Sequence, residues 1–276
     1  MNDQTPGLMK LFRQSKAAIG MLHVGALPGT PRHAGQLEAV IAQAVAEAGA
    51  LTEAGFDGLL IENMHDVPYL CGAVGPEIVA ALTAVGVAVR GASPLPLGVQ
   101  VLAAANREAL AVAHACGVAF VRVENFAYAH VADEGLMPTA EAGPLLRYRR
   151  QIGADAVRII ADVKKKHASH ALTADVPLDE TARTAEFFGA DGIVVTGVAT
   201  GRPTAVEDVV AVRRAVQVPV CIGSGLTPAN LPGLWPHADV FIVGSYLKQE
   251  GLWSNALDAE RVAAFIKAVR RLRAGP

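Results

Sequence analysis

Short apolar runs rich in β-branched residues alternate along the chain with longer Ala-rich segments, whose apolar residues recur at helical spacing. The short runs predict strands buried on both faces, and the longer segments predict amphipathic helices. Eight such units can be counted. The predicted strands cover 18–24, 58–63, 96–102, 120–124, 158–163, 192–196, 219–222 and 240–243. The predicted helices cover 36–54, 74–86, 106–116, 142–153, 179–189, 205–216, 228–235 and 258–273.

The regular alternation of strand and helix predicts the fold class. Crossovers of helical length join parallel strands, and a parallel sheet needs cover on both faces. A doubly wound sheet also meets these conditions. Eight repeats favour a closed barrel, however, and no G-x-G-x-x-G motif follows the first predicted strand. We therefore expect an α/β protein with a single (β/α)8 TIM barrel over 1–276, including an N-terminal extension at 1–17 and a C-terminal helix within 258–276.

Several boundaries carry their own signals. Gly55 and Gly86 are expected to end helices, and Thr227-Pro228 is expected to supply an N-cap and the first turn of a helix. The phrase Gly-x-Asp-Gly occurs at 55–58 and again at 189–192, where it joins a helix to a strand and is expected to stabilise the barrel bottom. The 28 residues between the fifth and sixth predicted strands are long enough to include a functional loop.

Composition and charge exclude several classes of protein. The chain is 52% hydrophobic and 18% charged, as suits a large buried core, and its net charge of −2 gives no general attraction to nucleic acid. It shows neither a signal peptide nor an apolar run long enough for membrane insertion, so we expect a cytoplasmic protein. Cys71, Cys116 and Cys221 form no C-x-x-C pair and predict neither disulfides nor a zinc site.

Polar side chains collect at the ends of the first five predicted strands. In a barrel, the C-terminal strand ends form the face that carries the active site. Polar side chains from five strands would meet on this one face, which indicates a functional site rather than unrelated surface residues. The residues in question are His23, Glu62, Asn63, Gln100, Glu124, Asp162, the lysines 164–166 and His167.

Glycine and small polar residues follow the last three predicted strands. Glycine lets backbone N–H groups approach an oxyanion closely, and a helix beginning after Thr227 would add positive partial charge. Phosphate sites often form at this end of a TIM barrel, so we expect a barrel of the phosphate-binding type with a phosphorylated small-molecule ligand across its mouth. The predicted ligand residues here are Thr196, Gly197, Gly223, Ser224, Gly225, Asn230, Gly244 and Ser245, together with His23 and Asn63 from the first two strands.

A metal ion is kept open as an alternative. Glu62, His65 and Asp66 lie near each other in sequence, but no zinc-binding spacing joins them to His23. A hard ion such as Mg²⁺, bound through carboxylates, would leave little signature.

Six phrases of the chain resemble the BtpA/SgcQ family of barrel proteins. They are IGMLHVGALPGTP (19–31), GFDGLLIENMHDVPY (55–69), ADVKKKHASH (161–170), VVTGVATG (194–201), IGSGLTPAN (222–230) and FIVGSYLK (241–248). The resemblance implies a phosphate-binding TIM barrel of the ribulose-phosphate type. One branch is associated with photosystem I biogenesis, and another is encoded with sugar-uptake and sugar-phosphate genes. The third-strand region departs from the family pattern, with Gln100 and Asn106-Arg107 in place of asparagines and an Asn-Asp pair.

The leading hypothesis is an enzyme that acts on a phosphorylated sugar, ribosyl or nucleotide-like compound. Glu124 and Asp162 would transfer protons or hold a ribose, Glu62 would be a second carboxylate, Lys166 would stabilise charge, and His167 is a further catalytic candidate.

Three alternatives stay open. A lysine of 164–166 could form a Schiff base in an aldolase, or Asp162-Val-Lys164 could belong to a decarboxylase-like site in which His167 replaces the usual carboxylate. The protein could also be a non-catalytic assembly factor. Homo-oligomerisation is expected from the frequency of oligomers among soluble proteins.

Overall fold

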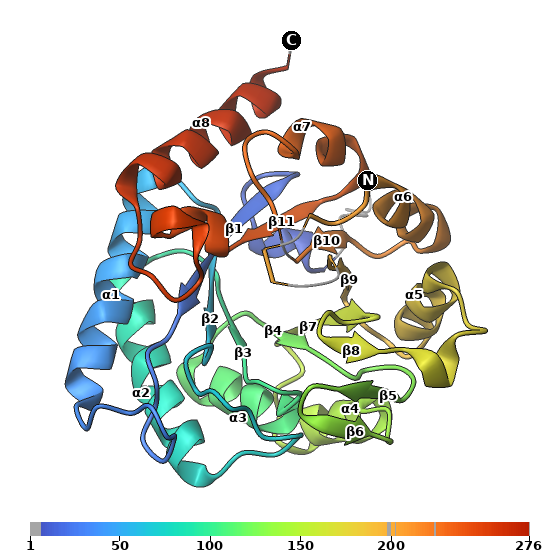
Figure 1. Cartoon of the computed structure of the whole chain (residues 1–276), viewed down its shortest axis with the longest axis horizontal. Helices are drawn as coiled ribbons and strands as arrows, with labels where there is room; N and C mark the ends of the chain where they lie inside the picture. The colour runs from blue at the N-terminus through green and yellow to red at the C-terminus, as the bar shows by residue number, and fades with distance from the viewer. Residues whose placement is uncertain (1–6, 198–199, 202, 224, 276) are drawn as a thin grey trace.

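Eight parallel strands close into a barrel, and helices form a ring around it (Figure 1). A computed structural model describes residues 7–197, 200–201, 203–223 and 225–275. The barrel strands are β1 (Ala17–His23), β2 (Gly58–Glu62), β3 (Leu97–Gln100), β4 (Phe120–Val123), β7 (Arg158–Val163), β9 (Gly192–Val195), β10 (Val220–Ile222) and β11 (Val240–Val243). They pair in the order β1-β11-β10-β9-β7-β4-β3-β2. The predicted (β/α)8 barrel is confirmed.

A helix lies at each of the eight predicted positions, although the bounds of α2 and α7 differ from the predicted ones. The helices are α1 (Leu37–Ala54), α2 (Pro76–Ala92), α3 (Asn106–Cys116), α4 (Ala142–Gln151), α5 (Leu178–Phe187), α6 (Val206–Ala215), α7 (Leu231–Leu234) and α8 (Ala259–Ala274). Their apolar faces pack on the outer side of the strands and form the largest hydrophobic cluster of the molecule. Within the described residues, no helix is both long enough and apolar enough to cross a bilayer.

A small antiparallel sheet stands outside the barrel and has the strand order β6-β5-β8. A hairpin of β5 (His130–Ala132) and β6 (Gly135–Met137) lies between β4 and α4, and β8 (Ala168–Ser169) lies between β7 and α5. The sequence analysis expected a functional loop in the segment that contains β8, but it predicted neither β8 nor the hairpin. Three-residue strands are too short to show a hydrophobic period.

The interior of the barrel is a separate apolar cluster built from alternate strand residues. Side chains of a strand point alternately to its two faces, so Ala17, Ile19 and Met21 of β1 all face inward. The N-terminal segment closes the bottom, where a short 3₁₀ helix, η1 (Met9–Leu11), and its neighbour Phe12 join this cluster. The predicted N-terminal extension therefore contributes part of the barrel core.

The inward-facing positions of the strands continue to the top of the barrel, where polar residues replace the apolar ones. Two residues beyond Met21 on β1 stands His23, and two beyond Leu60 on β2 stands Glu62. The same step on the other strands leads to the buried residues Gln100, Arg122 and Asp162. The polar layer is therefore the uppermost layer of the barrel interior.

Aspartates at the start of three strands brace the barrel bottom. Asp57 Oδ2 accepts a hydrogen bond from the N–H of Ala18 at 2.7 Å, and Asp191 Oδ2 accepts one from Ile159 at 2.9 Å. Asp239 Oδ2 accepts in the same way from a β10 amide at 2.9 Å. All three carboxylates also pair with arginines. The repeated Gly-x-Asp-Gly phrase thus marks positions where a side chain ties two strands together.

Two predicted boundaries were wrong. Gly86 does not end α2, which continues to Ala92. A Cβ on Gly86 would lie 2.7 Å from the sulfur of Cys116, so glycine there lets α2 pack closely on α3. Thr227-Pro228 does not begin α7 either. Thr227 and Asn230 exchange backbone-to-side-chain hydrogen bonds of 2.8 and 3.3 Å, which hold 228–230 as a turn.

Substitutions at two glycines test the packing, because one should lower the free energy of unfolding and the other should raise it. A Cβ on Gly98 of β3 would lie 2.2 Å from Cε2 of Phe120 on the neighbouring strand, whereas no atom lies within 4 Å of a Cβ on Gly49 in α1. We expect Gly98→Ala to lower the free energy of unfolding by about 1–3 kcal/mol through overpacking. Gly49→Ala should raise it by about 0.5–1 kcal/mol, because alanine is the better helix former. Urea unfolding measures both, and a stabilising Gly98→Ala would contradict the packing described here.

Candidate functional site

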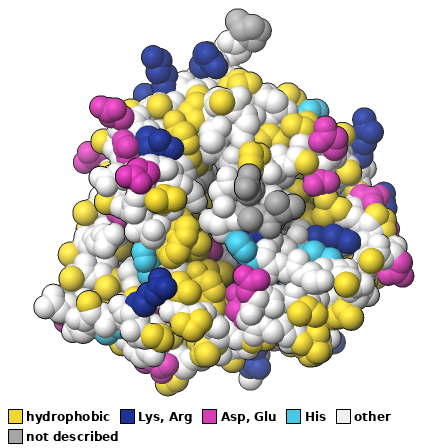
Figure 2. All heavy atoms as spheres, viewed as in Figure 1, with side chains coloured by type: hydrophobic (Ala, Val, Ile, Leu, Met, Phe, Trp, Pro, Cys, Tyr) yellow, Lys and Arg dark blue, Asp and Glu magenta, His cyan; other side chains and the backbone are white. Residues whose placement is uncertain are grey.

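The mouth of the barrel is hollowed by two adjoining cavities. The chamber, of about 350 Å³, and the recess, of about 30 Å³, share the lining residues Glu62, Met64, Arg122, Lys166 and Thr200. Figure 2 shows hydrophobic side chains beside acidic and histidine side chains near the middle of this face. The polar layer predicted from the strand ends therefore borders a real cavity.

A buried ion pair between β4 and β7 stands at the centre of the mouth. Arg122 donates from Nε to Oδ1 of Asp162 at 3.0 Å and from Nη2 to Oδ2 at 2.9 Å. Burial disfavours the guanidinium charge, but the Asp162 carboxylate outweighs it and raises the pKa of Arg122. Both oxygens of Asp162 are engaged, so this carboxylate holds Arg122 in place. Arg122 was not predicted as a site residue, although its position two residues beyond the inward-facing Phe120 was a usable signal.

The loop after β7 places three successive lysines in different surroundings. Its backbone passes through the left-handed region at Lys164 and at His167. Lys164 donates to a loop carbonyl at 3.3 Å, whereas Lys165 is buried and donates to Glu124 at 3.1 Å and Glu134 at 3.4 Å. Burial lowers the pKa of Lys165, but these two carboxylates outweigh it, so the net pKa is raised. Glu134 is a lining residue that the sequence analysis missed, whereas Lys165 was among the lysines 164–166 that it named.

Lys166 lines both cavities, and so does Glu62. Neither side chain forms a hydrogen bond or ion pair with any other residue that the structure describes. Burial raises the pKa of Glu62, and burial together with the Arg122 charge lowers the pKa of Lys166. The two groups are thus shifted toward each other, as in acid–base pairs of active sites.

His23 contributes a neutral imidazole to the recess. Its Nδ1 lies 2.9 Å from the carbonyl oxygen of Trp253 and must donate, because a carbonyl only accepts. Nε2 is therefore a lone-pair acceptor. Burial first, and then the nearby Lys248 ammonium, lower the pKa of His23 to about 3. Lys248 is itself buried and bonds Glu47 of α1 at 2.7 Å.

Glycines leave the recess open where a side chain would fill it. A Cβ on Gly244 would lie 2.8 Å from Nε2 of His23, and one on Gly223 would lie 2.9 Å from Nη2 of Arg122. Gly225 has a φ of +67°, which glycine adopts without strain. Five of the predicted ligand residues therefore line the recess: His23, Gly223, Gly225, Gly244 and Ser245. Arg122 and Lys166 line it with them.

Other predicted ligand residues support the loops. The amide of Asn63 accepts from the N–H of Leu102 at 2.7 Å and donates to Asp66 at 2.9 Å. Asn230 donates to the carbonyl of Gly225 at 2.7 Å. His167 is exposed, and its Nε2 accepts from the N–H of Thr200 at 3.1 Å, so it links two loops at the mouth.

The remaining predicted ligand residues are Thr196, Gly197 and Ser224. Thr196 is partly buried, and its hydroxyl has no hydrogen-bond partner in the described part of the chain. Gly197 lines neither cavity. Ser224 lies outside the described residues.

The described residues contain no group of three or more His, Cys, Asp or Glu side chains arranged to hold a metal ion. The carboxylates of Glu124 and Asp162 are paired with cationic side chains instead. The alternative of Mg²⁺ at the mouth stays a prediction.

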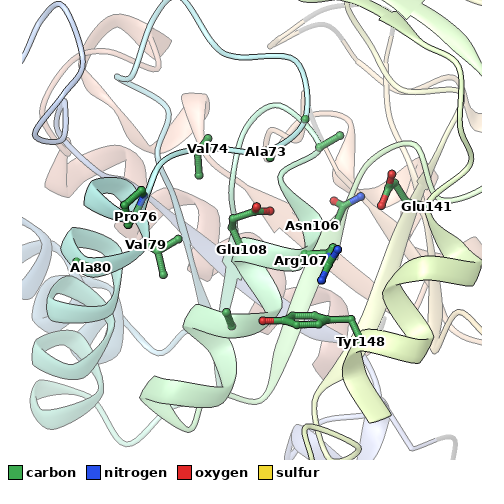
Figure 3. Close-up of a pocket in the computed structure, with 13 residues that line it drawn as sticks. Ala73, Val74, Pro76, Val79, Ala80, Asn106, Arg107, Glu108, Glu141 and Tyr148 are labelled. Carbon is green, nitrogen blue, oxygen red and sulfur yellow. The ribbon is translucent and has the colours of Figure 1, made fainter. Parts of the chain in front are cut away.

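Another cavity, of about 550 Å³, lies outside the barrel, where α2, α3 and α4 begin (Figure 3). The Arg107 guanidinium lies 4.6 Å from the ring centroid of Tyr148, and the carboxylates of Glu108 and Glu141 stand nearby. No residue predicted for the site lines this groove. The candidate site is therefore the smaller pair of cavities at the mouth.

Adjacent lysines provide a matched test of the charge arrangement. Because the folded state lowers the pKa of Lys166, its charge costs stability at neutral pH, and Lys166→Met should leave the melting temperature unchanged or higher. Lys165→Met should instead lower the free energy of unfolding by roughly 3–5 kcal/mol, since it strands two buried carboxylates. Calorimetry at pH 7 measures both. A greater loss for Lys166→Met would show that the roles of these lysines are reversed.

His23 should make the protein sensitive to acid. Its pKa in the folded state, about 3, lies below the ordinary 6.5, so the unfolded chain binds the extra proton and stability falls as pH drops from 6.5 toward 3. The full effect is about 5 kcal/mol at most. His130, with its pKa lowered to about 4, acts in the same direction. We expect His23→Gln to flatten the pH dependence of urea unfolding without abolishing it, and an unchanged slope would contradict a neutral buried His23.

Known proteins resemble this chain in sequence and in fold. An uncharacterized protein of Caenorhabditis elegans, named as mitochondrial, is 44% identical over 96% of this chain and 97% of its own length. The photosystem I biogenesis protein BtpA of Synechocystis is 38% identical over 95% and 91%. Among solved structures, a 3-hexulose-6-phosphate synthase covers 91% of this chain and 99% of its own, with a TM-score of 0.58 and 15% identity.

The thiamine phosphate pyrophosphorylase of Pyrococcus furiosus covers 93% of this chain and 96% of its own, with a TM-score of 0.54 and 15% identity. These two solved structures show the shared barrel fold. The name of the worm relative leaves the cytoplasmic location a prediction. The model of the BtpA family matches residues 14–271, nearly the whole chain. This chain is therefore a member of the BtpA family.

Proposed function

We propose that this protein is an enzyme acting on a phosphorylated sugar or ribosyl compound, with the phosphate in the recess and the remainder in the chamber. The observation that carries the proposal is the composition of the recess: two cationic side chains, Arg122 and Lys166, line a space kept open by glycines that follow β10 and β11. The names of the solved barrels with the same fold include enzymes of phosphorylated compounds, which supports the choice.

Phosphate binding follows from charge and access. The Arg122 guanidinium is fixed by Asp162 and still presents one edge to the recess, beside Gly223. Lys166 has no carboxylate partner among the described residues, so a dianion would supply the missing one and would restore the ordinary pKa of the ammonium. Backbone N–H groups near Gly223, Gly225 and Gly244 can add neutral hydrogen bonds.

The chemistry proposed is proton transfer in the chamber. Burial favours the neutral carboxylic acid of Glu62, which can donate its proton to a leaving or carbonyl oxygen of the ligand. The resulting carboxylate is stabilised by Arg122 and Lys166, whose charges already lower its pKa. On the recess side, Nε2 of His23 can accept a hydrogen bond from a ligand hydroxyl beside the phosphate and so orient it. Asp162 and Glu124 would position the cations rather than exchange protons.

A second chemistry is favoured by one observation. Lys166 is a half-buried amine with a lowered pKa and no partner among the described residues, which are the properties of a Schiff-base lysine. Its neutral amine would attack the carbonyl carbon of a sugar phosphate, and loss of water would leave an imine. Lys164 and Lys165 suit this role less well, because both side chains already donate hydrogen bonds.

The phosphate site is tested by a pair of substitutions at one position. We expect sugar phosphates and phosphoribosyl compounds to raise the melting temperature, since a ligand at 100 times its Kd adds about 2.7 kcal/mol to the folded state. Gly225→Asp should abolish this shift, because aspartate tolerates positive φ but repels an anion. Gly225→Asn has the same shape without the charge and should keep most of the shift.

The outcomes separate the candidate functions. A shift lost in both variants would indicate a backbone effect and contradict the electrostatic argument. Borohydride added with a bound sugar phosphate gives a covalent adduct on Lys166 only in the Schiff-base mechanism. If no phosphorylated compound shifts the melting temperature, the proposal fails, and a non-catalytic assembly role like that in the name of the Synechocystis relative takes its place.

A further inference from the structure

The chamber is lined by both charged and apolar residues. Its charged lining residues come from β2, β4, the β5–β6 hairpin and the loops after β4 and β7, and its apolar lining residues come from the loops after β2, β3 and β11. We define the apolar wall as Met64, Tyr69, Leu102 and Trp253, which belong to one hydrophobic cluster at the mouth. From the wall and one side chain within it, we infer that the chamber recognises a planar heterocyclic ring. The substrate would then be nucleotide-like rather than a simple sugar phosphate. This inference rests on the proposed phosphate site.

The apolar wall suits the faces of a ring and not the hydroxyls of a sugar. The Tyr69 hydroxyl donates to the carbonyl of Met64 at 2.7 Å, and burial raises its pKa, so it stays neutral and its ring is what the chamber meets. The Trp253 ring is braced by His65 at a centroid distance of 4.9 Å. A hydroxyl pressed against such a wall would lose its hydrogen bonds to water without replacement, whereas an aromatic face loses none.

Gln100 supplies the polar recognition. It is 2% exposed, it lines the chamber, and its Oε1 has no hydrogen-bond partner. Its side-chain amide bonds no other residue in the described part of the chain, although Glu62 stands beside it in the strand register. A carboxamide offers one donor and one acceptor side by side. Its natural complement is the edge of a ring with an adjacent acceptor and donor, as in the lactam or amidine edge of a nucleobase.

The three parts fit one ligand. With the phosphate in the recess and the ring against the apolar wall near Gln100, the pentose lies between them, next to Glu62 and Lys166, which line both cavities. The volume of about 350 Å³ falls in the range of small-molecule sites. The acid–base pair then stands beside the sugar, where a bond to the ring or to a hydroxyl would be made or broken.

The fluorescence of Trp253 can report on ring binding. The chain has two tryptophans, and Trp235 stacks on Phe241 away from the mouth, so Trp235→Phe leaves a single reporter. We expect the 5′-monophosphates of uridine or adenosine to quench Trp253 and to bind at least tenfold more tightly than ribose 5-phosphate. Ribose 5-phosphate binding as tightly as both nucleotides would overturn the inference.

A substitution at Gln100 separates ring recognition from phosphate binding. Gln100→Leu keeps the size of the side chain but removes the amide. We expect it to reduce the nucleotide preference to less than threefold and to leave the affinity for inorganic phosphate unchanged. An unchanged preference would show that Gln100 does not read the ring.

Uridine and adenosine without phosphate distinguish failure of this inference from failure of the proposed function. Suppose that no phosphorylated compound, including inorganic phosphate, binds more tightly than its phosphate-free counterpart. The phosphate site then fails. Quenching of Trp253 by the nucleosides that is lost in Gln100→Leu would still support ring recognition, and absence of such quenching would overturn it as well.

Discussion

The ion pair between Arg122 and Asp162 is the contact around which the mouth of this barrel is organised. Two charges on neighbouring strands are taken out of water, and the bidentate geometry makes this tolerable. The charge of the fixed guanidinium then acts on the two neighbouring titratable groups. It lowers the pKa of Glu62, which burial raises, and it lowers the pKa of Lys166, which burial also lowers. In the proposed function, a ligand anion would pair with the cationic side chains of the recess, Arg122 and Lys166.

The barrel separates stability from function along its axis. At the bottom, carboxylates such as Asp57 and Asp191 are engaged by strand N–H groups and arginines, and the N-terminal segment fills the interior. At the top, Glu62 and Gln100 are buried and Lys166 is half-buried, without comparable partners in the described chain. Unsatisfied groups of this kind cost stability, and in the proposed function a ligand makes up the difference.

In the proposed complex, the chamber and the recess together divide recognition into three kinds of interaction. Charge and glycine backbone act in the recess, titratable groups stand where the cavities meet, and an apolar wall with one amide lies beyond. Loops after different strands contribute each part, and Trp253 comes from a segment far along the chain from Met64. The barrel provides the common frame, since the C-terminal ends of parallel strands converge on one face.

The sequence by itself determined the eight strands, their parallel order, and the set of strand ends that carry polar residues. These follow from hydrophobic periodicity and alternation, which are local properties of a strand or helix. Glu62, Lys166 and the glycines of the recess could be placed near each other for the same reason. Arg122 could also have been found, because it keeps the inward-facing parity of Phe120.

The tertiary structure alone decided which charges pair. Lys165 and Lys166 are neighbours in sequence with the same chemistry, yet one is held by Glu124 and Glu134 and the other faces the recess. That difference depends on the irregular backbone around Lys164 and on a hairpin from another loop. Side-chain pairing between distant segments is set by three-dimensional proximity, and local sequence patterns carry no record of it.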